Sequence, residues 1–193
     1  MKRTPITTQH VVLAGLLAAF IVTTWYVLDV RPAHAPASES TPTAKTSTFE
    51  SDELHLSFKY PGTYTLVKRE IDVNGSLATY LTLTHTGETT PEAGEGPTGL
   101  TVAIFPNPKN LDLADWLHSM NSTAPTPTSG FDFAETRVDG NDALTYTSTG
   151  LYESDNVAVS HKGAIYIFSG SWRTREDQTV KDLGALITSV DLR

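Results

Sequence analysis

The residue types that come nearest to a hydrolytic site in this sequence are Asp115, His118 and Ser119. A serine nucleophile needs a histidine that faces its hydroxyl group and an acid that orients the histidine, and these residues usually come from different elements of a fold. Here all three fall in one predicted short helix, in which adjacent side chains diverge by about 100°. We therefore interpret them as a polar helix face rather than as a catalytic site.

A second combination of the same residue types is Asp155, Ser160 and His161. The serine and the histidine are adjacent in a predicted strand, and adjacent strand residues point to opposite faces of a sheet. Because Lys162 and Gly163 follow His161, we expect the histidine to lie in a turn. This spacing does not predict a catalytic residue either.

Glu88, Glu92 and Glu95 are candidate ligands of a divalent cation, because carboxylate oxygens bind Ca²⁺ and Mg²⁺. Their spacing matches no known cation-binding loop, and Gly and Pro surround them, so we interpret the segment as a solvated loop. The chain has no cysteine, which excludes disulfides and thiolate metal sites. We therefore assign no metal-binding residue and expect no cofactor.

Arg173, Arg175 and Lys181 could contact an anionic partner, although we interpret them first as ordinary surface charge. The formal net charge of the chain is −8, and most of its acidic residues follow residue 48. An acidic domain is repelled by phosphate backbones and by anionic lipid surfaces. We therefore expect no nucleic-acid partner.

The elements that must position these residues follow an N-terminal apolar run, Val11–Leu28, which carries no charge. A helix of this length spans roughly 27 Å, close to the ~30 Å hydrocarbon core of a bilayer. Lys2 and Arg3 precede the run, and positive charge favours the cytoplasmic side. We predict a single-pass plasma-membrane protein with a cytoplasmic N-terminus over residues 1–10, a transmembrane helix over 11–30 and an extracytoplasmic C-terminal domain.

The alternative to a retained anchor is a cleaved signal peptide. Ala33-His34-Ala35 has the small-x-small pattern of a cleavage site. Against cleavage, the apolar run is longer than the usual ~7–15 residues, and Pro36 directly follows the cleavage point. We favour the anchor, whereas cleavage after Ala35 would give a secreted domain.

Residues 31–48 contain three prolines among Ala, Ser and Thr. This composition does not form a hydrophobic core and favours an extended chain, so we predict a disordered linker. At ~3.1 Å per residue in a polyproline-like state the linker reaches up to about 55 Å. The linker therefore holds the domain, residues 49–193, away from the bilayer.

The domain alternates between short strands and two amphipathic helices. Alternating apolar residues and turn signals predict strands over 54–60, 63–73, 76–86, 100–104, 131–138, 143–149, 155–161 and 164–172. Asn74-Gly75 and Asp139-Gly140 are hairpin signals, so the strands pair antiparallel.

The first helix is predicted to follow Asn110 as its N-cap and to bury Trp116 and Leu117. The second, over 176–189, has an apolar stripe that leaves Asp182 outside. We predict an α+β fold, with a central antiparallel sheet of about six to eight strands and two packed helices, preceded by one transmembrane helix.

Three short stretches of the domain, taken in their order along the chain, match a pattern that is seen in other proteins. They are Phe58-Lys59-Tyr60-Pro61 at the end of a strand, Val138-Asp139-Gly140-Asn141-Asp142-Ala143 in a hairpin, and Leu186-Ile187-Thr188-Ser189-Val190 in the closing helix. Together they resemble the PsbP-like family of antiparallel α/β/α sandwich domains over residues 50–193. The resemblance implies a sheet of about six strands with helices on its faces. It also implies a binding or assembly role, because most members act in this way, but it identifies no metal-binding residue in this sequence.

We therefore expect a non-enzymatic, membrane-tethered, extracytoplasmic binding or assembly module. The membrane contact is the Val11–Leu28 helix, and the sequence does not identify the protein partner. The alternative is an extracytoplasmic hydrolase or small-ligand binder whose site combines distant residues. That alternative predicts a deep pocket that holds His118 or His161 with carboxylates nearby.

Overall fold

The computed structural model describes residues 45–73, 75–88, 97–120 and 132–193. The predicted cytoplasmic segment, the transmembrane helix over 11–30 and residues 31–44 of the predicted linker lie outside these ranges. Within the described ranges, no helix has the length and apolar character needed to cross a membrane.

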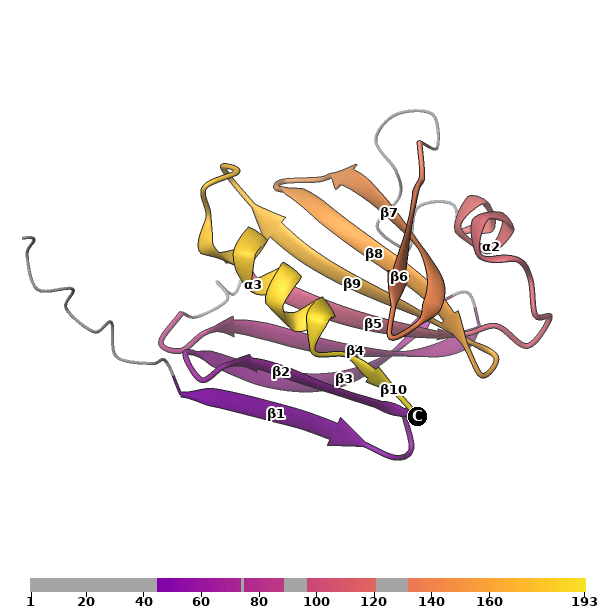
Figure 1. Ribbon diagram of the computed structural model, residues 1–193, viewed down its shortest axis with the longest axis horizontal. Helices are drawn as coiled ribbons and strands as arrows, with labels where there is room; N and C mark the ends of the chain where they lie inside the picture. The colour runs from indigo at the N-terminus through magenta and orange to yellow at the C-terminus, as the bar shows by residue number, and fades with distance from the viewer. Residues whose placement is uncertain (1–44, 74, 89–96, 121–131) are drawn as a thin grey trace, which may run out of the picture. The chain divides into compact units, whose positions relative to one another are not determined.

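The centre of the domain is a seven-stranded antiparallel sheet in the order β3-β4-β5-β9-β8-β7-β6 (Figure 1). Its strands are β3 (Tyr64–Val73), β4 (Ser76–His85), β5 (Leu100–Pro106), β6 (Ala134–Val138), β7 (Asn141–Thr149), β8 (Glu153–His161) and β9 (Ala164–Trp172). Two-residue turns close the β3–β4 and β6–β7 hairpins at the predicted positions. Asp139 and Gly140 have φ of 47° and 75°, the left-handed conformation that a tight hairpin turn requires.

A second, three-stranded sheet has the order β1-β2-β10 and was only partly predicted. Its strands are β1 (Thr46–Ser51), β2 (Leu56–Pro61) and β10 (Asp191–Leu192). β1 begins at Thr46, so the last three residues of the predicted linker belong to a strand and the domain starts before residue 49. β1 was not predicted because its sequence is polar. Its residues alternate only between exposed and half-buried, so it lacks the regular apolar residues that predict a strand.

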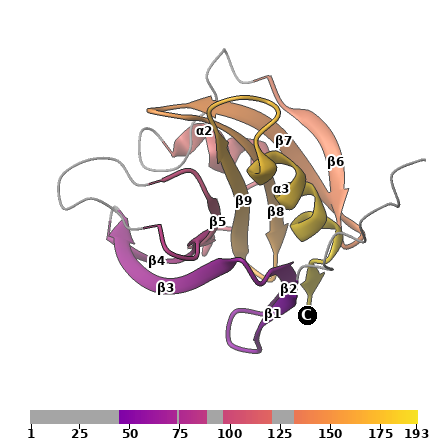
Figure 2. The same ribbon diagram turned by 90° about the vertical axis from the view of Figure 1, so that its left-hand side faces the viewer.

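The two helices cover opposite faces of the large sheet, as Figure 2 shows. α3 (Gln178–Thr188) buries Leu183 and Leu186 against one face, together with the small sheet. α2 (Leu113–Ser119) buries Trp116 and Leu117 against the other face. We call these the α3 face and the α2 face. The predicted α+β class, with a central antiparallel sheet and two packed helices, is confirmed.

Two details of the predicted helices are wrong. The N-cap of α2 is Asp112, whose carboxylate accepts a hydrogen bond from the Ala114 N–H at 3.0 Å. Asn110 instead lies in the preceding turn with a φ of 47°. Asp182, which was placed outside the apolar stripe of α3, is buried because a hydrogen-bonded tyrosine and glutamine neutralise the cost of its burial.

Candidate functional site

The structure does not assemble either combination of Asp, His and Ser that the sequence offered as a hydrolytic site. In α2, the Ser119 hydroxyl donates to the main-chain oxygen of Trp116 at 2.7 Å, and the ring of His118 lies 5.4 Å from the ring of Phe133. In β8, Asp155 faces Gly170 of β9 whereas His161 faces Ala164, so the two residues lie at opposite parts of the strand.

His161 is the last residue of β8 rather than a turn residue, and its Nε2 lies 3.2 Å from the main-chain oxygen of Arg193. Of the three glutamates of the acidic loop, Glu92 and Glu95 lie outside the described residues. In the described part of the chain, no three His, Asp or Glu side chains come together in a way that could hold a metal ion.

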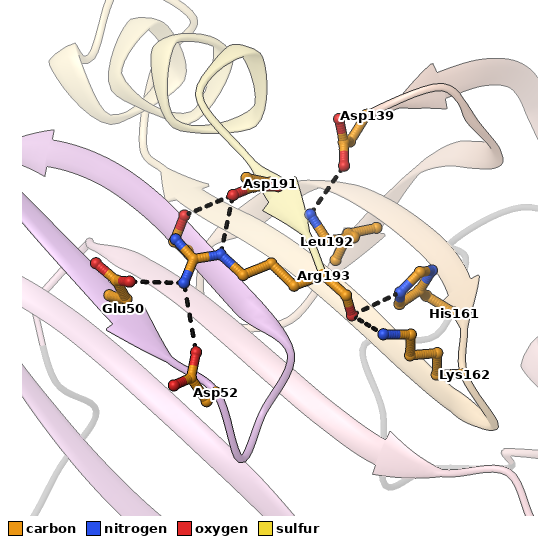
Figure 3. Close-up of polar contacts among 9 residues, drawn as sticks. Glu50, Asp52, Asp139, His161, Lys162, Asp191, Leu192 and Arg193 are labelled. Atoms are coloured by element: carbon orange, nitrogen blue, oxygen red, sulfur yellow. Dashed lines mark hydrogen bonds and ion pairs between the residues drawn. The ribbon is translucent and has the colours of Figure 1, made fainter.

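The densest group of charges surrounds the side chain of Arg193 (Figure 3). Its Nη1 lies 2.6 Å from Glu50 and 3.4 Å from Asp52, and its Nε lies 3.0 Å from Asp191. Hydrogen bonds to Glu50 and Asp191 raise the pKa of the Arg193 guanidinium above its usual range. Because these contacts join β1, the β1–β2 turn and β10, the group holds the small sheet together.

The main chain at the same place joins the small sheet to the large one (Figure 3). The main-chain oxygen of Arg193 accepts from the Lys162 ammonium group, and the Leu192 N–H donates to Asp139 at 2.9 Å. Lys162 and Asp139 lie in the β8–β9 and β6–β7 hairpin turns, at one end of the large sheet. We interpret this group as a structural clasp, since its charges face one another rather than a hollow.

Two arginines at the opposite end of β9 are stacked on aromatic rings. The guanidinium of Arg175 lies 4.0 Å from the ring centre of Trp172, and its Nη1 pairs with Asp155 at 2.5 Å. The guanidinium of Arg173 lies 5.3 Å from the ring centre of Tyr152. We call Tyr152, Trp172, Arg173 and Arg175 the arginine–aromatic surface.

The loop that carries both arginines is held in place by Asp177. Its carboxylate accepts from the N–H of Arg173 at 2.7 Å and from the hydroxyl of Thr174 at 3.0 Å. The backbone hydrogen bond from Arg173 is the main reason why the pKa of Asp177 is lowered. Asp177 therefore holds the backbone of the loop at Arg173 and Thr174, whereas Arg175 is held by its side-chain contacts with Trp172 and Asp155.

A hollow of about 410 Å³ lies beside Arg175 on the large sheet. Residues from three strands and two loops line it, and the polar and charged ones include Asp132, Thr145, Thr147, Asp155 and Arg175. Thr147 donates to Asp155 at 3.4 Å, so the carboxylate that holds Arg175 is itself bonded. This hollow and the arginine–aromatic surface together form the candidate site.

A larger hollow, of about 770 Å³, lies between the start of α2 and the β6–β7 hairpin. Its charged groups are open to solvent, since the side chains of Arg137 and Asp142 are 74% and 91% exposed even though they pair at 3.3 Å. Neither hollow is lined by His118 or His161, one of which the alternative of a hydrolase or small-ligand binder requires. The smaller hollow is the better candidate because Trp172 stacks on Arg175, the arginine that lines it.

The sequence suggested Arg173 and Arg175 as contacts for a partner, and the structure places both in the loop between β9 and α3. Sequence reasoning missed their aromatic partners. Trp172 precedes the arginines directly, which was an available signal, but Tyr152 lies about 20 positions earlier along the chain. Lys181, the third suggested cation, lies on the exposed side of α3.

Comparison with known proteins bears on the fold. No family model matches the chain, and no curated protein does. Among solved structures, the chain is similar to the solution structure of cyanobacterial PsbP (CyanoP) from Synechocystis sp. PCC 6803, with 16% identity and a TM-score of 0.54, over 80% of this chain and 96% of that one. The fold is PsbP-like.

A second similar solved structure is a crystal structure from Bacteroides thetaiotaomicron VPI-5482. It shares 14% identity at a TM-score of 0.44, and the match covers 76% of this chain but 48% of that one. The resemblance to the PsbP-like family that the short sequence stretches indicated is thus supported at the level of the fold by the cyanobacterial structure.

Proposed function

We propose that this chain is a non-enzymatic, membrane-tethered, extracytoplasmic binding module that holds a protein partner at the arginine–aromatic surface. The PsbP-like fold is consistent with a binding or assembly role. The observation that carries the proposal is the pair of stacked arginines beside the hollow. The apolar run of Val11–Leu28 and the proline-containing segment after it support the tether.

Arginine and aromatic side chains are the groups that contribute most to protein–protein affinity. An arginine that is already stacked on a ring and fixed by its loop loses little conformational entropy when a partner binds. Both arginines are stacked on rings, the loop backbone is bonded at Arg173, and an ion pair with Asp155 holds Arg175. A partner therefore gains affinity here at a smaller entropic cost than at a free surface arginine.

The partner is expected to present a carboxylate to Arg173. The guanidinium of Arg173 is bonded to the Tyr152 hydroxyl at 3.4 Å, and this long contact leaves donors for a bidentate carboxylate. Arg175 is already paired with Asp155. Since the hollow beside Arg175 has hydroxyl groups from Thr145 and Thr147 among its lining, it suits a short polar side chain of the same partner segment.

The test is site-specific photo-crosslinking of the full chain in intact membranes. A photoreactive residue in place of exposed Glu176, in the same loop, should give an adduct with another protein, whereas the same residue in place of exposed Lys109 serves as the matched control. Arg173→Ala should reduce the Glu176 adduct by about tenfold, as loss of one charged hydrogen bond predicts. No adduct at position 176, or equal adducts at both positions, contradicts the proposal.

The tether is tested separately by washing membranes with alkaline carbonate. The full-length chain should stay with the bilayer, because roughly 3–6 kcal/mol of insertion free energy is expected from the apolar side chains of Val11–Leu28. Release of a fragment that begins near Pro36 would show cleavage and a secreted domain. That result would remove the tether but leave the binding surface in place.

A further inference from the structure

β3 is an unusual edge strand. It stands at one end of the seven-stranded sheet and has ten residues, of which the six consecutive residues 67–72 are exposed. Val67 is 42% exposed and Ile71 is 45% exposed. A long edge with apolar side chains invites pairing with another strand, and proteins usually shorten, charge or cover such edges. Within the described residues no strand pairs with this side of β3.

The backbone groups that β3 offers at its open side follow from its ladder with β4. The Thr86 N–H donates to the main-chain oxygen of Thr63 at 2.7 Å, so Thr63 and Thr86 form a hydrogen-bonded pair. Hydrogen-bonded and non-hydrogen-bonded pairs alternate along an antiparallel ladder. The odd-numbered residues of β3 therefore bond to β4, and the even-numbered residues direct their N–H and C=O groups outward.

The side chains of β3 divide between the two faces of the sheet. Val67, Arg69 and Ile71 lie on the α2 face, since the β4 residue opposite Ile71 is Ala78, which is buried with the residues that contact α2. Lys68 and Glu70 lie on the α3 face, where their charged groups approach to 3.6 Å. The sequence Val-Lys-Arg-Glu-Ile is centred on Arg69. An apolar residue lies two positions to either side of it, and residues of opposite charge, Lys68 and Glu70, lie one position to either side.

We propose that β3 pairs antiparallel with β3 of a second copy of this chain, around a two-fold axis at Arg69. In this register Val67 of one copy faces Ile71 of the other, and Lys68 faces Glu70. Both contacts occur twice, because a two-fold interface repeats each contact. The outward groups of Lys68 and Glu70 bond to each other, so the sheet continues across the two copies.

Self-complementarity selects a second copy over an unrelated partner. Cross-strand apolar pairs and opposite-charge pairs each stabilise an antiparallel ladder, whereas like charges opposite one another destabilise it. A register centred on Glu70 would bring Glu70 against Glu70 and Arg69 against Ile71. The register centred on Arg69 has one unfavourable pair, the two Arg69 side chains at the axis.

This unfavourable pair gives the proposal a distinctive test. Arg69→Thr removes the like-charge contact and introduces a β-branched side chain, so it should tighten the association, by about fivefold or more in the dimer dissociation constant. Lys68→Glu should weaken it, and the exchange Lys68→Glu with Glu70→Lys should restore it. The measurement is sedimentation equilibrium of the full chain in density-matched detergent, with Thr136→Ala, an exposed position on β6 at the other edge of the sheet, as control.

A second measurement uses the absence of cysteine from the chain. Non-hydrogen-bonded residues across an antiparallel ladder have Cα atoms about 4.5 Å apart, within the range that a disulfide spans. Mild oxidation of the full-length Arg69→Cys variant in membranes should therefore give a covalent dimer. Thr136→Cys on β6, the other edge strand, and Glu70→Cys are the matched controls and should give little.

The proposal is overturned by several results. One is a wild-type chain that stays monomeric at all concentrations and an Arg69→Cys variant that forms no disulfide. Another is equal disulfide yield from Arg69→Cys and Thr136→Cys, which would indicate random collision. A third is a higher yield from Glu70→Cys than from Arg69→Cys, which would exclude this register. Failure here leaves the arginine–aromatic surface untouched, because that surface includes no residue of β3.

Discussion

The two edges of the large sheet are built differently. β6 has five residues, four of them exposed, and includes a charged pair at its hairpin. β3 is twice as long and exposes two apolar side chains on one face. Charge alone does not distinguish the edges, since four of the six exposed residues 67–72 of β3 are charged. A short edge resists pairing with another strand, whereas a long edge with apolar side chains and charges of both signs can pair over several residues. This domain therefore protects one edge and leaves the other available.

A buried tyrosine lies near each edge, and the two tyrosines also differ. Tyr64, the first residue of β3, donates its hydroxyl hydrogen to Asp182 at 2.8 Å, and Gln178 donates to the same carboxylate at 2.8 Å. Tyr146, in β7 beside β6, has a buried hydroxyl with no hydrogen-bond partner among the described residues. The β3 side thus has a satisfied polar group in its interior, and the β6 side has an unsatisfied one.

The largest effect is expected from removing the two hydroxyl groups one at a time. Tyr64→Phe should lower the free energy of unfolding by about 2 kcal/mol, because it removes a hydrogen bond to a buried carboxylate. Tyr146→Phe should change it by less than about 0.5 kcal/mol or stabilise the protein, because the hydroxyl makes no bond that could be lost. Urea unfolding of the two variants measures the difference. Equal losses would mean that the two tyrosines are equivalent after all.

Alkaline pH should lower the stability of the protein through the tyrosines near both edges of the sheet. Burial raises the pKa of Tyr146, and burial together with the hydrogen bond to Asp182 raises the pKa of Tyr64 above its usual range. A raised pKa means that the folded state favours the neutral phenol. The stability it contributes is complete below the unfolded-state pKa of about 10 and is lost as pH rises through the folded-state values.

The measurement is unfolding by urea at a series of pH values between about 8 and 12. Wild-type stability should stay level up to a pH of about 10 and then fall. Each Tyr→Phe variant should fall less steeply, because one raised pKa has been removed. A variant whose stability falls as steeply as the wild type would show that its tyrosine does not control the alkaline transition.

The strands also differ in how far the sequence could predict them. The β3–β4 hairpin and its exposed strand followed from alternation and from Asn74-Gly75, which are local signals. β10 could not be predicted from local signals, because it has only two residues and these pair with β2 only when α3 places them beside it. The first three residues of β1 are polar and were assigned to the linker for that reason, although the pairing of β1 with β2 extends over six residues.

The candidate site was predictable in part for the same reason. The two arginines are adjacent in sequence to Trp172, but Tyr152 and Asp155 reach them through the pairing of β8 with β9. The buried Asp182 was the least predictable residue. Its spacing in α3 suggested an exposed position, whereas hydrogen bonds from Gln178 and from Tyr64, which is far away in the sequence, make its burial possible.

The smallest effects on the free energy of unfolding are expected from two ion pairs, one in the arginine–aromatic surface and one beside β3. Arg175 and Asp155 pair at 2.5 Å with side chains that are 54% and 27% exposed. Lys68 and Glu53, beside β3, approach to 3.6 Å with side chains that are 39% and 78% exposed. Exposed pairs contribute about 0–1 kcal/mol, and close, partly buried geometry moves a pair toward the upper value.

Asp155→Asn should therefore lower the free energy of unfolding by about 0.5–1 kcal/mol, whereas Glu53→Gln should change it by no more than about 0.3 kcal/mol. Sodium chloride at about 1 M should reduce the first effect, since the Debye length is then about 3 Å. The stacking of Arg175 on Trp172 should persist in the Asn variant, and indole fluorescence reports it. If Glu53→Gln costs as much as Asp155→Asn, then the ring beneath Arg175 adds nothing to its ion pair, and the arginine–aromatic surface is no more preorganised than the charges along β3.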